Sequence, residues 1–107
     1  MDTCTVTELQ DELDDGESPL VLDVRTAEEL RIAHLAGACH IPLDALSMRA
    51  TELDDWREKD IVCMCHHGMR SAHAQEILLS LGFTKVRNLT GGIHAWAVEI
   101  DPKMARY

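Results

Sequence analysis

The segment of this sequence best suited to chemistry is a cysteine that is followed closely by a glycine and an arginine. Residues 65–70 read CHHGMR; an apolar run precedes them and a stretch with helical spacing follows. Gly68 permits a sharp turn, and a compact loop that leads into a helix can direct several N–H groups at one point. Those dipoles and the charge of Arg70 favour an anion. We therefore expect the pKa of Cys65 to be depressed and its thiolate to act as a nucleophile.

Two anion chemistries suit such a loop. Cysteine phosphatases place five residues between cysteine and arginine, whereas Arg70 arrives one residue early here and Ser71 takes the phosphatase position. A phosphate ester needs a loop wide enough to surround its equatorial oxygens. The shorter loop favours a smaller group, such as the outer sulfur of thiosulfate or of a persulfide. A small phosphatase or arsenate reductase remains the alternative.

The pattern of apolar and amphipathic stretches predicts how this loop is positioned. Short apolar runs alternate with stretches of helical spacing, which is typical of an α/β fold with a mainly parallel sheet. Two pairs, Thr7 with Gln10 and Thr26 with Glu29, have the spacing of capping boxes at helix starts. Strands are expected at residues 19–24, 37–42, 60–65 and 85–89, and helices over 7–15, 27–33, 43–53, 71–81 and within 91–100.

Functional sites in such folds lie beyond the carboxyl ends of the strands, and two strand ends carry reactive or charged side chains. One of them delivers Cys65, and the other delivers Asp23 and Arg25. We expect Asp23 to anchor its turn and Arg25 to add positive charge toward the anion. An ordinary salt-linked turn accounts for this pair equally well.

The remaining cysteines and histidines have simpler explanations. Cys63 lies two residues before Cys65 on the same strand, so we expect it to face the same side and to pack in the core rather than act as a resolving thiol. Cys4 and Cys39 are expected to take no part in the chemistry. A structural zinc site usually needs a second, separated pair of ligands, so no metal is expected at the cluster of Cys63, Cys65, His66, His67 and His73.

Length and charge limit the possible partners. The chain has 107 residues, which suits one domain over residues 1–107. Its formal net charge of -9 argues against nucleic acid and anionic membranes, whereas a small anionic substrate needs only a local positive pocket. No apolar segment is long enough to span a membrane, and the acidic start is unlike a signal peptide. We therefore expect a cytoplasmic protein with free thiols.

Three motifs together resemble those of the rhodanese family, and the resemblance covers nearly the whole chain. CHHGMR is similar to the family's six-residue active loop, which begins with the catalytic cysteine, and GGIHAW (residues 91–96) is similar to its C-terminal motif. Two departures stand out, because Ala33 replaces a usual glycine and His66 replaces the arginine that often follows the cysteine in thiosulfate-using members. The segment VLDVRTAEELRIAHLAGACHIPL resembles the N-terminal motif through Asp23, Arg25, Glu28, His34, Gly37, Ala38, Ile41 and Pro42.

This resemblance implies a fold, a reaction and a set of site residues. The fold is a central, mainly parallel five-stranded sheet with helices on both faces. Cys65 takes sulfur from a small anionic donor and passes it to a thiol or a sulfur-accepting protein, without a metal or an organic cofactor. A non-catalytic rhodanese-fold binding module is the alternative, and the intact Cys65, Gly68 and Arg70 argue against it. The residues implied to bind the anion or persulfide are His66, His67, Gly68, Met69, Arg70 and Ser71, with Arg25 as a helper.

Overall fold

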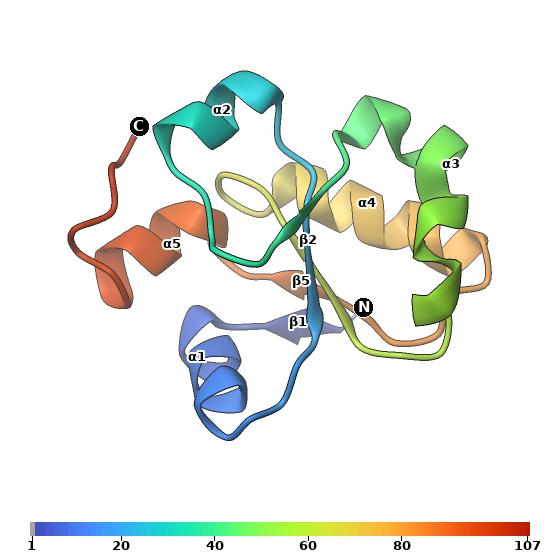
Figure 1. The fold of residues 1–107 in the computed structure, drawn as a ribbon, viewed down its shortest axis with the longest axis horizontal. Coiled ribbons are helices and arrows are strands. Elements are labelled where there is room, and N and C mark those ends of the chain that lie inside the picture. Colours follow the sequence, from blue (N-terminus) through green and yellow to red (C-terminus); the bar gives the residue numbers. More distant parts are fainter. Residues whose placement is uncertain (1) are drawn as a thin grey trace.

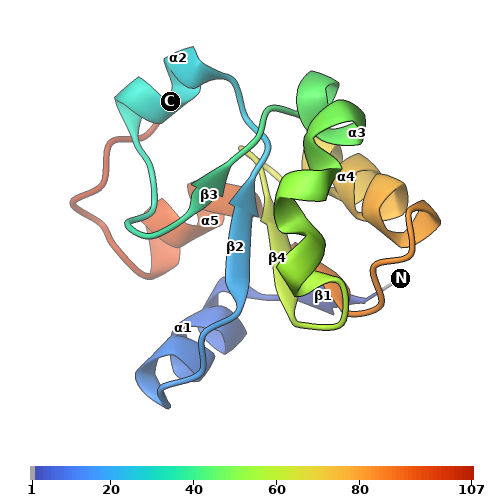
Figure 2. The same ribbon diagram turned by 45° about the vertical axis from the view of Figure 1, so that its right-hand side comes forward.

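The sheet that carries the site has five strands, all parallel, in the order β1-β5-β4-β2-β3. A computed structural model describes residues 2–107, and Figures 1 and 2 show the sheet at the centre of the ribbon. β4 lies in the middle of the sheet, between β5 and β2, so its carboxyl end opens at a central position. The strands are β1 Thr3–Cys4, β2 Leu20–Asp23, β3 Cys39–His40, β4 Ile61–Met64 and β5 Val86–Leu89.

Helices cover both faces of the sheet. α1 (Val6–Asp14) and α5 (Gly92–Glu99) pack on one face, whereas α3 (Leu46–Arg49) and α4 (Met69–Ser80) pack on the other. α2 (Ala27–Ile32) follows β2 near the end of the sheet that carries the site (Figures 1 and 2). Within residues 2–107, no helix combines the length and the apolar character that crossing a membrane requires.

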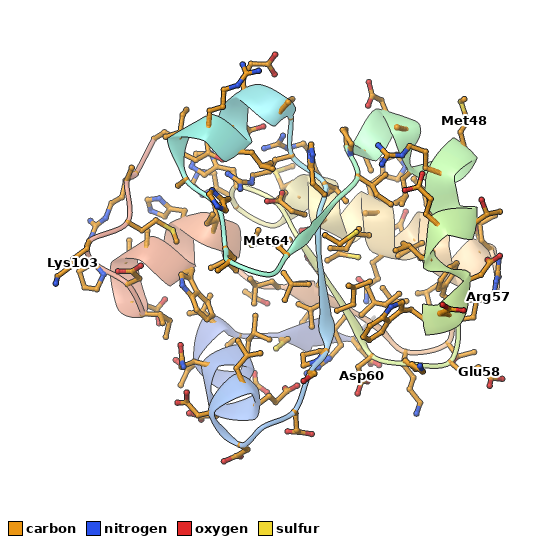
Figure 3. The ribbon with its side chains drawn as sticks, in the orientation of Figure 1. Met48, Arg57, Glu58, Asp60, Met64 and Lys103 are labelled. Atoms are coloured by element: carbon orange, nitrogen blue, oxygen red, sulfur yellow. The ribbon has the colours of Figure 1, made fainter. Side chains whose placement is uncertain are left out.

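Alternation along β4 divides its side chains between two hydrophobic cores. Ile61 and Cys63 join the core on the α3–α4 side, whereas Val62 and Met64 join the core on the α1–α5 side. All four residues of β4 are buried, as expected for a parallel strand with both faces covered. Figure 3 shows Met64 in the interior of the molecule and Met48 at its periphery.

The start of α1 differs from the prediction. The N-cap is Thr5, whose side chain accepts a hydrogen bond from the backbone N–H of Glu8, and the carboxylate of Glu8 accepts one from the backbone of Thr5. The predicted box at Thr7 and Gln10 is therefore wrong. With Thr5 as the cap, Val6 enters the first turn, and it is buried against the sheet together with Leu9. The second predicted capping box, at Thr26 and Glu29, is confirmed.

Other elements also differ from the prediction. The helix expected over residues 43–53 is one turn of α3 between two 3₁₀ helices, Leu43–Ala45 and Ala50–Trp56. α4 begins at Met69 rather than at Ser71, because Gly68 serves as its N-cap. β1 has only two residues, too few to show a pattern in the sequence, and it becomes the fifth strand by pairing with β5.

Candidate functional site

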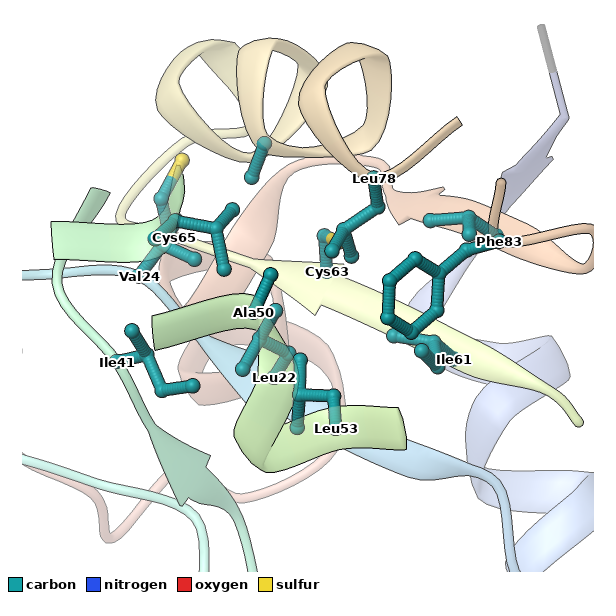
Figure 4. Packing of buried hydrophobic residues seen from close by; sticks show 13 residues of the cluster. Leu22, Val24, Ile41, Ala50, Leu53, Ile61, Cys63, Cys65, Leu78 and Phe83 are labelled. Atoms are coloured by element: carbon teal, nitrogen blue, oxygen red, sulfur yellow. The ribbon is translucent and has the colours of Figure 1, made fainter. Parts of the chain in front are cut away.

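Cys65 follows directly after β4 and lies beneath the loop that connects this strand to α4. Only 1% of its surface is exposed. It shares a core with Cys63 and Val24, which confirms that Cys63 and Cys65 face the same side of the sheet. Figure 4 shows the sulfur of Cys65 directed toward α4. The sulfur therefore meets the groups that the loop and the first turn of this helix present.

Hydrogen-bond donors surround the sulfur of Cys65. The backbone N–H of Gly68 donates to it over 3.0 Å, and the hydroxyl oxygen of Ser71 lies 3.3 Å from it. Burial raises the pKa of this thiol, but the Ser71 hydroxyl and the backbone N–H groups of Ser71, Gly68 and His67 outweigh burial. The pKa of Cys65 consequently lies below its ordinary value, in the direction expected from the sequence.

The starts of two helices, α4 and α5, hold the loop in place. Gly68 adopts a left-handed conformation with φ of 113° and caps α4, and the backbone N–H groups of Gly68 and Ser71 approach the sulfur. On the other side, the backbone N–H of Ile93 donates to the carbonyl of Cys65 over 2.9 Å, and that of His94 donates to the carbonyl of His66 over 3.0 Å. These contacts fix the loop between the starts of α4 and α5.

Arg70 forms an ion pair with Glu29 in α2. Its terminal nitrogens lie 2.5 and 2.9 Å from the two carboxylate oxygens. This pairing lowers the pKa of Glu29 and raises that of Arg70. Hydrogen bonds lower the pKa of the Cys65 thiol most, whereas Arg70 and Cys65 interact through their charges. The expected role of Arg70 in activating Cys65 stays a prediction. A direct contact of Arg70 with a bound anion stays a prediction, and it requires the pair to open.

Arg25 is buried and bonded to neighbouring protein groups. Its guanidinium donates to both carboxylate oxygens of Asp23, over 2.7 to 3.2 Å, and to the carbonyl of Ala33 and the hydroxyl of Tyr107, each over 2.9 Å. Asp23 also accepts from the backbone N–H of Arg25 over 3.1 Å, which anchors the turn as expected. This geometry is that of a salt-linked turn. Anion binding by Arg25 stays a prediction that its placement does not favour.

The side chains of His66, His67 and Met69 lie on the outer side of the loop. The ring of His66 stacks on Tyr107, with centroids 3.8 Å apart, and the His67 ring lies 4.0 Å from that of His66. Burial, followed by the neighbouring His67, lowers the pKa of His66. Met69 is 85% exposed. Among the residues predicted to bind the substrate, the structure thus brings Gly68, Ser71 and the backbone of His67 to the sulfur.

The other thiols lie in environments that disfavour ionisation. Burial raises the pKa of Cys63 to about 12, which makes it a poor resolving thiol. Burial also raises the pKa values of Cys4 and Cys39. Across residues 2–107, no group of three or more histidine, cysteine, aspartate or glutamate side chains is arranged to hold a metal ion.

Three side chains that shape the site were not identified as such from the sequence. Asn88 of β5 contacts the loop, Tyr107 covers His66, and Glu29, recognised only as a helix cap, also holds Arg70. The hydroxyl of Tyr107 donates to Glu29 over 2.7 Å. Each of these contacts joins residues that are far apart in the chain, so no local pattern predicts them.

We expect the pair of Glu29 and Arg70 to make stability depend on acidic pH. Because Arg70 lowers the folded-state pKa of Glu29, the carboxylate stabilises the fold above its unfolded pKa of about 4.3, and this contribution is lost as pH falls toward the folded pKa. In urea unfolding, wild type should be more stable than Glu29→Gln at about pH 6, and the difference should shrink below about pH 4.

The neighbouring Glu28 provides a matched control, because it is exposed and makes no side-chain hydrogen bond to another described residue. Glu28→Gln should leave the free energy of unfolding nearly unchanged across the same pH range. A difference between wild type and Glu29→Gln that stays constant with pH would contradict the stabilising role of the ionised Glu29.

Comparison with known proteins agrees with this geometry. The family model described as a rhodanese-like domain matches residues 5–99. A sulfurtransferase of Allochromatium vinosum is 35% identical over 89 residues, which cover 83% of this chain and 81% of that protein. The putative sulfur carrier protein YrkF of Bacillus subtilis is 40% identical over 84 residues, which cover 78% of this chain and 44% of YrkF. The crystal structure of a rhodanese-related protein from Thermoplasma volcanium has a TM-score of 0.83 at 31% identity and covers 94% of each chain.

These matches confirm the expected fold, since the parallel five-stranded sheet is shared with rhodanese-fold structures. The chain spans less than half the length of the first curated relatives, covering 44% of one and 21% of the next. Their names, sulfur carrier and sulfurtransferase, support sulfur transfer in general. With a family model that extends over residues 5–99, the chain belongs to the rhodanese-like domain family.

Proposed function

We propose that this chain moves sulfane sulfur from a donor, such as thiosulfate or a persulfide, to a thiophilic acceptor through a persulfide on Cys65. One observation carries the proposal: the thiol of Cys65, at the end of a central strand, has a lowered pKa, and its sulfur accepts a hydrogen bond from the backbone N–H of Gly68. A thiolate in such a surrounding is a nucleophile. The same donors can hold the charge of a persulfide.

The reaction consists of two displacements at sulfur. The Cys65 thiolate attacks the outer sulfur of thiosulfate, the sulfur–sulfur bond of the donor breaks, and sulfite leaves with the electron pair. Cys65 then carries a persulfide anion. An acceptor thiolate attacks the outer sulfur of this persulfide, a new sulfur–sulfur bond forms on the acceptor, and the Cys65 thiolate leaves. Neither step requires a metal or an organic cofactor.

The surroundings of Arg70 support sulfur over phosphate as the transferred group. A phosphate ester carries its charge on several oxygens and suits the planar fork of a free guanidinium. Here Arg70 already binds Glu29 through both terminal nitrogens. The buried sulfur instead faces a hydroxyl and single N–H groups, which suit one small charged atom.

The proposal extends to the whole chain and its partners. We take residues 1–107 as one rhodanese-like domain that acts in the cytoplasm on a small anionic donor. The curated relative YrkF is named a putative sulfur carrier protein, which supports a protein as the donor or acceptor of sulfur. Capture of partners on the persulfide form of the protein, with Cys65→Ser as the control bait, would identify them.

Sulfur loading tests this function directly. After incubation with thiosulfate, the intact protein should gain the mass of one sulfur atom, peptide mass spectrometry should place it on Cys65, and cyanide should remove it. The same protein should leave an aryl phosphate unhydrolysed, because the loop lacks the phosphatase spacing. A protein that hydrolyses the phosphate well and takes up no sulfur would overturn the proposal. Binding of thiosulfate without any change of mass would favour a non-catalytic binding module.

A further inference from the structure

Asn88 contacts two of the residues whose groups approach the sulfur of Cys65, Gly68 and Ser71. It lies on β5, opposite Cys63 in the sheet register. Its Nδ2 donates to the carbonyl oxygen of Gly68 over 3.0 Å, and its Oδ1 lies 2.5 Å from the hydroxyl oxygen of Ser71. Asn88 is therefore linked to the sulfur through a single intervening residue on each side.

The hydroxyl of Ser71 has one proton and two acceptors within reach. Its oxygen lies 2.5 Å from Oδ1 of Asn88 and 3.3 Å from Sγ of Cys65. The carbonyl of Gly68 can only accept, so the amide nitrogen of Asn88 must face it and the amide oxygen must face Ser71. An amide oxygen cannot donate either, so the short contact requires the proton of Ser71.

This arrangement distinguishes the two protonation states of Cys65. While Ser71 donates to Asn88, its oxygen presents lone pairs to the sulfur. A neutral thiol completes a series of hydrogen bonds, because its S–H donates to Ser71 and Ser71 donates to Asn88. A thiolate faces the same lone pairs without a proton, which is unfavourable. Ser71 can stabilise the thiolate only by turning its O–H toward the sulfur, which breaks its bond to Asn88.

We propose that Asn88 is a positioning residue that competes with the Cys65 sulfur for the single hydroxyl proton of Ser71, and so reduces the stabilisation that Ser71 gives to the thiolate. A persulfide carries its charge on the outer sulfur, so Sγ then attracts the hydroxyl proton of Ser71 less strongly. The hydrogen bond from Ser71 to Asn88 therefore re-forms. Asn88 thus disfavours the free thiolate relative to the loaded form. This consequence for sulfur transfer rests on the proposed function, whereas the competition for the proton does not.

A purely structural role for Asn88 predicts the opposite result. If Asn88 only held the loop in place, its removal would loosen the N–H groups around the sulfur and raise the pKa of Cys65. The carbonyl of Gly68, however, also accepts from the backbone N–H of Ala72 over 3.2 Å, so it keeps a partner when Asn88 is shortened. Competition for the proton instead predicts that removal of the Asn88 amide lowers the pKa, because Ser71 is then free to donate to the thiolate.

The test is the pH dependence of iodoacetamide alkylation at Cys65 in the full chain, followed by peptide mass spectrometry. The midpoint reports the pKa, whereas access to the buried sulfur affects only the absolute rate. We expect Asn88→Ala to lower the midpoint by about one pH unit, the effect of one hydrogen bond to a charged group. Ser71→Ala should raise it by a similar amount. Asn88→Asp, which keeps an acceptor beside Ser71, should not lower it.

A double-mutant cycle shows whether Asn88 acts through Ser71. In the Ser71→Ala background, Asn88→Ala should shift the midpoint by less than about a third of its shift in wild type. A raised or unchanged midpoint in Asn88→Ala alone, or the same downward shift with and without Ser71, would overturn the inference. If Asn88→Ala fails to fold, Asn88→Leu removes the same acceptor with less loss of volume. A protein that shows the midpoint shifts but takes up no sulfur from thiosulfate would refute the proposed function and leave this inference intact.

Discussion

Replacement of Cys65 by serine should abolish sulfur loading from thiosulfate and reduce transfer to cyanide by a factor on the order of 10³ or more. Serine keeps the shape of the side chain, but its hydroxyl is neither ionised at neutral pH nor able to form a persulfide. The fold should survive, because the hydroxyl can accept from Gly68 N–H as the sulfur does. Loading is measured by intact mass, transfer by thiocyanate formation, and folding by urea denaturation.

Cys63→Ala is the matched control for this variant. Cys63 lies two residues away on the same face of the sheet, but it is fully buried and its pKa is raised to about 12. Its removal should lower the free energy of unfolding by about 1 kcal/mol, because the smaller side chain leaves a small cavity. Sulfur loading should persist. If loading vanished in folded Cys63→Ala, a mechanism with two cysteines would be the better account, and near-normal transfer in Cys65→Ser would exclude Cys65 as the carrier.

The parts of the fold that the sequence predicts are those with local causes. Apolar runs predict the strands β2 and β4 and the burial of all four residues of β4, and the spacing of Thr26 and Glu29 predicts the start of α2. The position of Cys65 at a strand end follows from the same reasoning. The pattern fails where an element is too short to carry one, as in β1, or where two spacings compete, as Thr5 with Glu8 and Thr7 with Gln10 do at α1.

The parts of the site that sequence reasoning missed depend on contacts between distant residues. Spacing along the chain places Arg70 at the end of the loop, but the direction of its guanidinium depends on Glu29, which is 41 residues away. Ser71 is placed at the helix start from the sequence, whereas its competing acceptor, Asn88, lies 17 residues further on. The direction of the pKa shift at Cys65 and the contribution of the loop N–H groups were predicted, whereas the larger contribution of the Ser71 hydroxyl was not.

We expect Gly92→Ala, which adds one methyl group at the start of α5, to disrupt the loop around Cys65. Gly92 has φ of 60°, which side-chain-bearing residues adopt only at a cost of about 1–2 kcal/mol. A Cβ at this position would also lie 2.5 Å from the carbonyl oxygen of His66 and in still closer contact with that of Cys65. Both are backbone atoms that accept hydrogen bonds from the start of α5, so they cannot swing aside as a flexible side chain does.

Because this clash involves the backbone of Cys65 itself, the variant should lose both stability and chemistry. We expect the free energy of unfolding to fall by about 2–5 kcal/mol, the sum of the backbone cost and of overpacking. Sulfur loading of the folded fraction should fall at least about tenfold, because displaced N–H groups no longer converge on the sulfur.

Gly37→Ala separates the two effects, since Gly37 has φ of 81° and nothing within 4 Å of an added Cβ. In Gly37→Ala the free energy of unfolding should fall only by the cost of the left-handed backbone conformation, and sulfur loading should be normal. Equal stability losses in the two variants, with normal loading in Gly92→Ala, would show that the contact of α5 with the loop does not position the groups around Cys65.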